Sequence, residues 1–240
     1  MNDIFTVPER ICFYHCDSRQ NLSLRTYLEW SGEMGNLHLE SRGITWQGML
    51  AERQAFLLSR LAFRRFRPAR YGMECRFQTW EGGVKGPSFL RNFQLLGPEG
   101  EVLAQSATTW MLVDPVDRRI LRPSQCVHEM RPCDRPVEPL IGRLRLSSLP
   151  QVAEHMVRPS QIDGNGHMGN QYYADLLSDY APEDLRGRTV LAAQLAFHHE
   201  ARLGETVTLF AAPDGADAFS MSGRLPDGRT CFEAQVQVAL

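Results

Sequence analysis

The pattern of apolar and polar positions predicts two helices, one in each half of the chain. The apolar positions of the first helix recur at helical spacing and are Leu24, Tyr27, Leu28 and Met34. Asn21 is expected to cap this helix. The second helix is expected to begin at Gln171 and to end before Pro182. Its broad apolar face is formed by Met168, Tyr172, Tyr173, Leu176, Leu177 and Tyr180.

Strand-like segments follow each predicted helix. In the first half they are residues 55–67, 73–81, 88–96 and 101–113, and in the second half 189–202, 205–212, 218–225 and 229–240. Pro98-Glu99-Gly100 and Pro226-Asp227-Gly228 are turn signals between neighbouring antiparallel strands. One helix with a strongly bent antiparallel sheet, present twice, predicts an α+β fold.

The two halves share a weak internal repeat, separated by about 130 residues. Leu61-Ala62-Phe63 matches Leu195-Ala196-Phe197, and an Asp-led polar turn precedes each helix, at Asp17 and at Asp163. Because the matches occur in the same order, a duplicated domain explains them better than chance. We therefore expect domains at residues 1–125 and 150–240, joined by a linker at 126–149 that is rich in Pro and Arg.

Composition and charge exclude several classes of protein. The net charge of −2 over 240 residues does not suggest a nucleic-acid partner. No apolar run reaches the roughly 18–20 residues of a membrane span, and a signal peptide is not expected at the N-terminus. The six cysteines form no CxxC pair, so we expect free thiols in a reducing cytoplasm and no zinc site.

The sharpest local signal is the polar turn from Asp163 to Asn170. Asp163, Asn165 and His167 place a carboxylate, a carboxamide and an imidazole at alternate positions, beside the free N–H groups of a helix start. This setting suits a carbonyl oxygen that gains negative charge during acyl transfer. A simple capped turn explains the same residues equally well. A calcium loop does not, because Ala174 stands where the bidentate Glu is needed.

A second polar group lies at the end of a predicted strand. If the strand is regular, His198 and Glu200 share one face and His199 lies on the other. A polar strand end that reaches solvent is the alternative interpretation.

Taken together, these features resemble the plant-type and bacterial acyl-acyl carrier protein thioesterases, over nearly the whole chain. In the first half the resemblance rests on residues 21–39, which carry Gly35-Asn36-Leu37-His38 near their end, and on residues 91–93, 108–111 and 117–123. In the second half it rests on Asp163-x-Asn165-x-His167-x-x-Asn170 and Glu200. That family implies two fused hot-dog domains, each a curved antiparallel sheet wrapped around a central helix.

The resemblance also implies the activity and the residues that carry it. It implies hydrolysis of fatty acyl thioesters to free fatty acid and carrier thiol in fatty acid biosynthesis, without cofactor or metal. Acyl carrier protein is the implied partner. The oligomeric state is left open, and a homodimer is one possibility because hot-dog sheets commonly pair through their edges. Asp163, Asn165, His167 and Glu200 are the implied catalytic positions.

Two departures from the family pattern affect the expected mechanism. Many relatives carry Cys where this chain has Ala201, so attack by a cysteine at that position is not available. Gly166 and Gly169 replace larger polar residues. We therefore expect direct attack by water, with Glu200 or His167 taking its proton.

The first half has no equivalent of the motif. Its turn at Asp17 contains no histidine, and Arg64-Arg65-Phe66 is expected to replace His198-His199-Glu200. The first half is therefore expected to hold most of the acyl pocket. Leu24, Tyr27, Leu28 and Trp46 are candidates for its lining, although core packing explains each of them as well.

Five arginines between residues 60 and 70 form a basic run on a nearly neutral chain. Arg64, Arg65 and Arg67 are candidates for docking an acidic carrier protein, which such charges would steer. A solvated edge strand is the alternative.

Three rival functions remain at this stage. The first is an acyl-coenzyme A thioesterase on the same fold. The second is a hot-dog hydratase or dehydratase, which would not need Glu200. The third is a non-catalytic acyl-binding protein, which Ala201 and the glycine-rich turn would suit.

Overall fold

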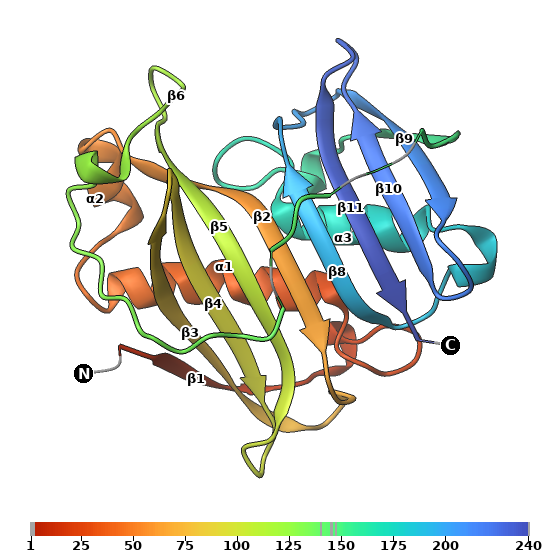
Figure 1. The fold of residues 1–240 in the computed structure, drawn as a ribbon, viewed down its shortest axis with the longest axis horizontal. Coiled ribbons are helices and arrows are strands. Elements are labelled where there is room, and N and C mark those ends of the chain that lie inside the picture. The colour runs from red at the N-terminus through yellow and green to blue at the C-terminus, as the bar shows by residue number, and fades with distance from the viewer. Residues whose placement is uncertain (1–2, 140, 145, 147, 240) are drawn as a thin grey trace.

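The computed structural model describes residues 3–139, 141–144, 146 and 148–239. These residues form one antiparallel sheet with helices on one side of it (Figure 1). The strands of the first half are β1 (Phe5–Arg10), β2 (Ala55–Arg65), β3 (Glu74–Lys85), β4 (Ser88–Leu96), β5 (Val102–Asp114) and β6 (Arg119–Ile120). Those of the second half are β7 (Gln151–Met156), β8 (Val190–Phe197), β9 (Thr206–Pro213), β10 (Ala218–Arg224) and β11 (Thr230–Val238).

The helices are α1 (Leu24–Glu40), α2 (Trp46–Ala51) and α3 (Asn170–Asp179), with 3-10 turns η1 (Phe13–His15), η2 (Pro123–Gln125), η3 (Pro159–Gln161) and η4 (Glu183–Leu185). The predicted α+β fold is confirmed, and the eight predicted strands all form. The prediction that Asn21 caps the first helix is wrong. Ser23 is the cap, because its hydroxyl accepts the backbone N–H of Thr26 at 3.1 Å.

Strands β2 and β8 join the two halves into one sheet. The order is β1-β3-β4-β5-β2-β8-β11-β10-β9-β7, and β6 pairs only with β5. Along this seam, Arg60 lies opposite Ala196 and Arg64 lies opposite Ala192. Strand β2 is therefore bonded on both sides, so the interpretation of the basic run as an edge strand is wrong. A homodimer through the outer edges stays a prediction.

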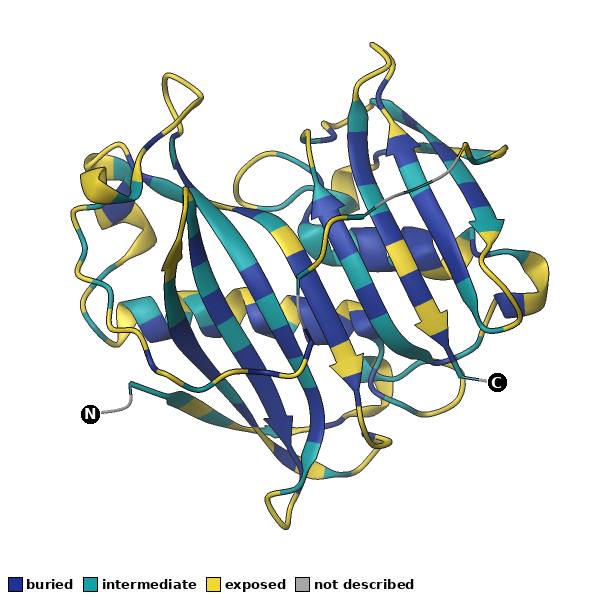
Figure 2. Cartoon of the chain, viewed as in Figure 1, coloured by how far each residue is buried: buried dark blue, intermediate teal, exposed yellow. Residues whose placement is uncertain are grey.

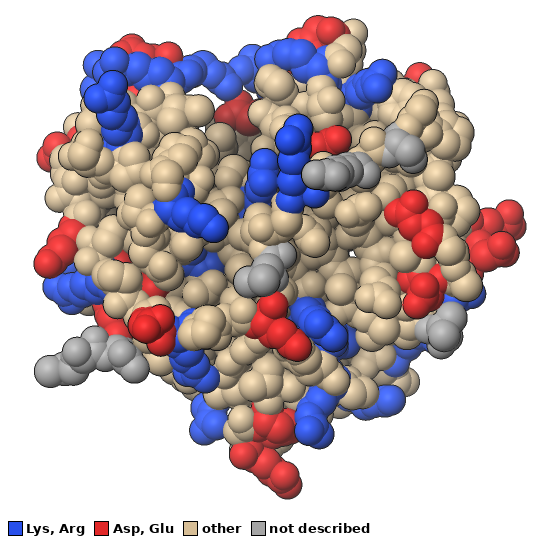
Figure 3. Space-filling model, viewed as in Figure 1, with Lys and Arg blue, Asp and Glu red and all other residues tan. Residues whose placement is uncertain are grey.

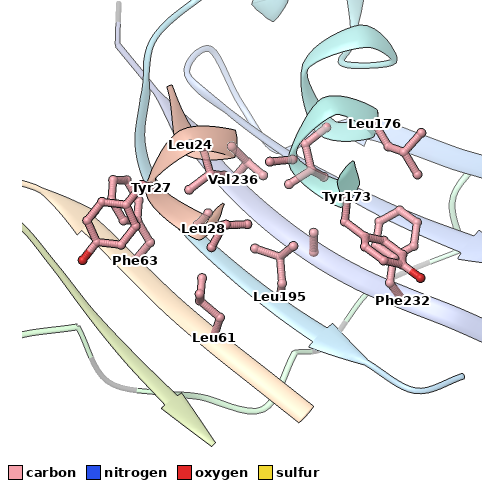
Figure 4. Close-up of a cluster of buried hydrophobic side chains, with 14 of the residues drawn as sticks. Leu24, Tyr27, Leu28, Leu61, Phe63, Tyr173, Leu176, Leu195, Phe232 and Val236 are labelled. Atoms are coloured by element: carbon pink, nitrogen blue, oxygen red, sulfur yellow. The ribbon is translucent and has the colours of Figure 1, made fainter. Parts of the chain in front are cut away.

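The main hydrophobic core crosses the seam. Helices α1 and α3 pack together, and the largest buried cluster draws residues from both halves (Figure 4). Tyr27 on α1 lies with its ring centroid 4.7 Å from that of Phe63 on β2, and Tyr173 on α3 lies 5.1 Å from Phe232 on β11. Buried and more exposed positions alternate along the strands (Figure 2), as expected for a sheet with one face on a core.

Hydrogen bonds after the central strands place the two halves in register. In each half, two successive amides donate to one carbonyl of the neighbouring strand: those of Phe66 and Arg67 to Leu103, and those of His198 and His199 to Cys231. Phe66 is thus the counterpart of His198, and Pro68 is the counterpart of Glu200. The predicted match of residues 61–63 with 195–197 is two residues out of register. Arg64-Arg65-Phe66 is accordingly not the counterpart of the His-His-Glu stretch.

Residues between the two halves cover the face of the sheet opposite the helices (Figure 1). Trp80 on β3 donates its indole N–H to the carbonyl of Arg135 at 2.9 Å, and Gly142 donates its N–H to the Gln194 side chain at 3.0 Å. The segment that was expected to link the halves thus also shields Trp80 from solvent. None of the described helices has both the length and the hydropathy needed to cross a membrane.

Candidate active site

The turn before α3 is organised around Asp163. Its backbone N–H donates to the carbonyl of His167 at 2.9 Å, and its carbonyl accepts the N–H of Gly166 at 3.0 Å. Its Oδ1 accepts the N–H of Asn165 at 2.8 Å. Gly166 has a φ of +81°, a conformation that favours glycine. The sequence therefore folds into a tight loop that carries the carboxylate, the carboxamide and the imidazole.

The start of α3 lies beside this loop. Gly169 is the N-cap and has no side chain to accept the first-turn amides. Asn170 and Gln171, which open the helix, line the same cavity as Asp163 and His167. The helix start thus offers N–H groups and the positive end of its dipole to a group that gains negative charge.

Glu200 reaches the site from a segment that follows β8. Because β8 ends at Phe197, the prediction that strand alternation places His198 and Glu200 on one face does not apply. His198 instead contacts Glu233 at 2.9 Å, away from the loop. The N–H of Met168 donates to the carbonyl of Ala201 at 2.9 Å, which ties the Glu200 segment to the loop.

The imidazole of His167 lies between two carboxylates. Its Nε2 is 4.0 Å from Glu200 Oε1, and its Nδ1 is 3.8 Å from Asp163 Oδ2. All three side chains are partly buried, while Asn165 is exposed at the cavity wall. The structure therefore brings the four predicted residues to one place. At 3.8 and 4.0 Å the two contacts of His167 are longer than hydrogen bonds and are charge contacts when the imidazole is protonated.

Arg118 is a member of this site that the motifs did not single out. Its Nη2 lies 2.5 Å from Glu200 Oε2. It belongs to the hairpin between β5 and β6, in the first half of the chain. The only signal for it was the resemblance over residues 117–123, which gave no role and no contact.

One cavity connects the site to the first half. Its volume is about 2290 Å³, and both halves line it. In the first half it runs between α1 and the sheet, past apolar residues that include Leu28, Met49, Phe89, Phe93 and Trp110. Of the four predicted lining residues, Leu28 and Trp46 face the cavity, whereas Leu24 and Tyr27 are packed in the core.

Helix α1 contains two glycines where it borders the cavity, Gly32 and Gly35. Glycine in a helix interior costs roughly 0.5–1 kcal/mol relative to alanine. Gly32 is exposed, and a side-chain carbon added there would meet nothing within 4 Å. At Gly35 an added carbon would meet Arg91 Cδ at 3.8 Å, an ordinary contact, so packing requires glycine at neither position.

The candidate docking arginines lie elsewhere and differ from one another. Arg65 is 8% exposed, and its guanidinium donates to the carbonyls of Leu22 and Val190. Burial also lowers the pKa of Arg65. Its side chain is therefore part of the interior and cannot dock a carrier, which corrects the prediction for this residue. Arg64 and Arg67 are exposed.

Positive charge is also present near the candidate site. Figure 3 shows Lys and Arg side chains along the upper edge of the molecule, spanning from the β5–β6 hairpin toward the β10–β11 hairpin over a hollow.

Comparison with solved structures shows the same fold. An acyl-ACP thioesterase from Bacteroides thetaiotaomicron superposes with a TM-score of 0.86 at 19% identity, over 99% of this chain and 98% of the other. The 12:0-ACP thioesterase from Umbellularia californica superposes with a TM-score of 0.82 at 16% identity, over 100% and 98%. A putative oleoyl thioesterase from Lactobacillus plantarum gives 0.82 at 20% identity, over 98% and 96%. A search of curated proteins finds no match.

Family models cover most of the chain. The acyl-ACP thioesterase N-terminal domain matches residues 3–129, and the acyl-ACP thioesterase C-terminal domain matches residues 147–225. The resemblance seen in the sequence and the predicted hot-dog fold are confirmed by these matches and by the superpositions. The chain belongs to the acyl-ACP thioesterase family and is a thioester hydrolase.

Proposed function

We propose that this enzyme releases free fatty acid from acyl-acyl carrier protein in fatty acid biosynthesis, at the site formed by Asp163, Asn165, His167 and Glu200. The observation that carries the proposal is the position of His167. It lies between the carboxylates of Asp163 and Glu200, on the wall of the cavity shared by both halves. An acyl chain in the first half would place its thioester against this group.

The residues support a general-base hydrolysis. Glu200, or His167 beside it, takes a proton from water while the water oxygen bonds to the thioester carbon. The carbonyl oxygen becomes negatively charged, and His167 with the first amides of α3 stabilises it. The carbon–sulfur bond then breaks, and the proton passes to the leaving sulfur. Asn165 holds the water or the acyl carbonyl, and Asp163 orients His167.

Nearby groups support attack by water rather than by sulfur. Ala201 is fully buried and has no nucleophilic atom. Cys231 is close to this region, but its sulfur lies 3.3 Å from the Tyr173 hydroxyl and burial raises the pKa of its thiol to about 11. A thiol with that pKa is almost entirely protonated near pH 7 and is a poor nucleophile.

The compartment follows from the cysteines. All six lie in the described part of the chain and carry free thiols. Free thiols suit a reducing compartment, and we place the enzyme in the cytoplasm.

The test is the release of fatty acid from a panel of acyl carrier proteins with graded chain lengths, with acyl-coenzyme A thioesters in parallel. We expect release from carrier-linked substrates and a loss of kcat of about 10²–10⁴-fold in Glu200→Gln. Glu233→Gln is the matched control, because this carboxylate contacts His198 outside the candidate site. Near-normal turnover of Glu200→Gln would refute the assignment. Release of fatty acid only from acyl-coenzyme A would show that coenzyme A, and not acyl carrier protein, carries the substrate. Binding of acyl substrate without release would indicate an acyl-binding protein.

A further inference from the structure

The carboxylate of Glu200 is held by two groups from different halves of the chain. Its Oε2 is bonded to Arg118 Nη2 at 2.5 Å, and its Oε1 faces His167 Nε2 at 4.0 Å. An arginine on one oxygen restrains the orientation of the carboxylate and leaves the other oxygen free for chemistry. The general-base mechanism gives Arg118 no role, so this contact is unexplained by it.

The hairpin that carries Arg118 is held in place by its own ion pairs. Asp114 is buried, and its Oδ1 accepts the N–H groups of Val116 and Asp117 at 3.0 and 3.1 Å. Arg53 donates one terminal nitrogen to both Asp114 and Asp117, at 3.0 and 2.7 Å. These contacts restrain the turn next to Arg118 and therefore the backbone from which its side chain extends.

Arg118 is one of three described residues other than glycine with a positive φ. Its φ is +51°, in the left-handed region that L-residues with long side chains rarely adopt. A residue in this region persists when the surrounding structure determines it, and such residues cluster at functional sites. Here the left-handed turn directs the side chain from the first half toward the site of the second.

We propose that Arg118 is a positioning residue for Glu200. The β5–β6 hairpin of the first half reaches across the seam and holds the carboxylate base of the second half in the orientation that faces His167. This inference rests on the proposed function, because it assigns Glu200 the role of base.

Other charged or titratable groups near Glu200 are already engaged. Tyr173 is buried, which raises its pKa, so its hydroxyl stays protonated. His198 contacts Glu233 at 2.9 Å, and His199 contacts a carbonyl at the start of β11 at 2.8 Å. Among the described residues, Arg118 and His167 are the basic side chains with a nitrogen within 4.0 Å of the Glu200 carboxylate, and Asp163 lies against the other nitrogen of His167.

The experiment compares Arg118→Gln with Arg119→Gln, using the full chain and acyl-acyl carrier protein. Arg119 is a matched control because it is exposed on the same hairpin, and its Nε lies 3.8 Å from Asp114 and Asp117. We expect Arg118→Gln to lower kcat about tenfold with KM within twofold, because the carboxylate loses the group that orients it. Arg118→Lys should restore part of kcat, and Arg119→Gln should resemble the wild type.

A second readout does not depend on turnover. In protein labelled with ¹³C at the Glu side-chain carboxyls, the Glu200 signal is assigned by its absence in Glu200→Gln. In Arg118→Gln this signal should shift relative to the wild type, because the carboxylate loses its hydrogen bond from Arg118, whereas in Arg119→Gln it should not move. Thermal melting confirms that each variant folds.

The outcomes separate this inference from the proposed function. A higher KM with unchanged kcat would show that Arg118 binds the carrier instead, and would overturn the inference. Identical behaviour of Arg118→Gln and Arg119→Gln would overturn it as well. A wild type without hydrolysis, or a fully active Glu200→Gln, would refute the proposed function itself.

Discussion

The loop at Asp163 and its counterpart at Asp17 have the same backbone hydrogen bonds at opposite ends of the seam. The N–H of Asp17 donates to the carbonyl of Asn21 at 2.7 Å, as that of Asp163 donates to His167 at 2.9 Å. In both loops the carboxylate accepts the N–H two residues later, and a residue with positive φ follows, Gln20 at 63° in the first loop. Duplication therefore preserved the backbone of the loop in both halves.

The side chains on this common backbone differ. Asn165 and His167 in the second loop correspond to Arg19 and Asn21 in the first, and Glu200 corresponds to Pro68. The first loop also bonds across the seam, because the hydroxyl of Thr189 donates to Asp17 Oδ2 at 3.0 Å. The fold thus supplies two equivalent loops, and a few side chains make one of them a candidate for chemistry and give the other contacts across the seam.

The largest effect should come from giving the second loop a side chain of the first. His167→Asn places there the residue type that Asn21 supplies to the same backbone. We expect kcat for acyl-acyl carrier protein to fall about 10²–10³-fold, because the oxyanion loses its imidazole partner. The melting temperature should change by only a few degrees. The reciprocal Asn21→His is the control and should keep kcat within twofold. An active His167→Asn would mean that the difference between the loops is not catalytic.

A smaller effect, on stability, is expected at the end of the seam that carries Asp17 and Arg65. Arg65→Ala leaves the buried carbonyls of Leu22 and Val190 without their donor and opens space beside them. The free energy of unfolding should fall by about 2–3 kcal/mol, which urea denaturation measures. Arg64→Ala, one residue away and exposed, should cost less than about 0.5 kcal/mol. Turnover per folded molecule should stay normal in both. Equal destabilisation by the two changes would contradict a stabilising role for the buried contacts of Arg65.

Helices α1 and α3 and most strands were predictable because their periodicity is local. Helix α2 and strands β1, β6 and β7 were missed, since each has at most six residues and too few positions to show a period. The loop at Asp163 was readable because its residues are close in sequence. Arg118 was not, because it approaches Glu200 from a hairpin in the other half. The predicted alignment of the two halves was wrong by two residues, because the shared Leu-Ala-Phe triplet does not mark equivalent backbone positions.

The smallest effect is expected from the exposed Arg64 and Arg67, at the end of the seam that carries Asp17. Arg64 lies opposite Ala192, and β8 runs five residues further to Phe197 before it reaches the Glu200 segment, a length of about 17 Å. A carrier docked on Arg64 and Arg67 would thus hold its thioester away from Glu200. Reversing both charges to Glu should change KM for acyl-acyl carrier protein by less than twofold, with a short synthetic thioester as the control. A selective fivefold rise in KM for the carrier substrate would instead mean that docking and chemistry occupy opposite ends of the seam.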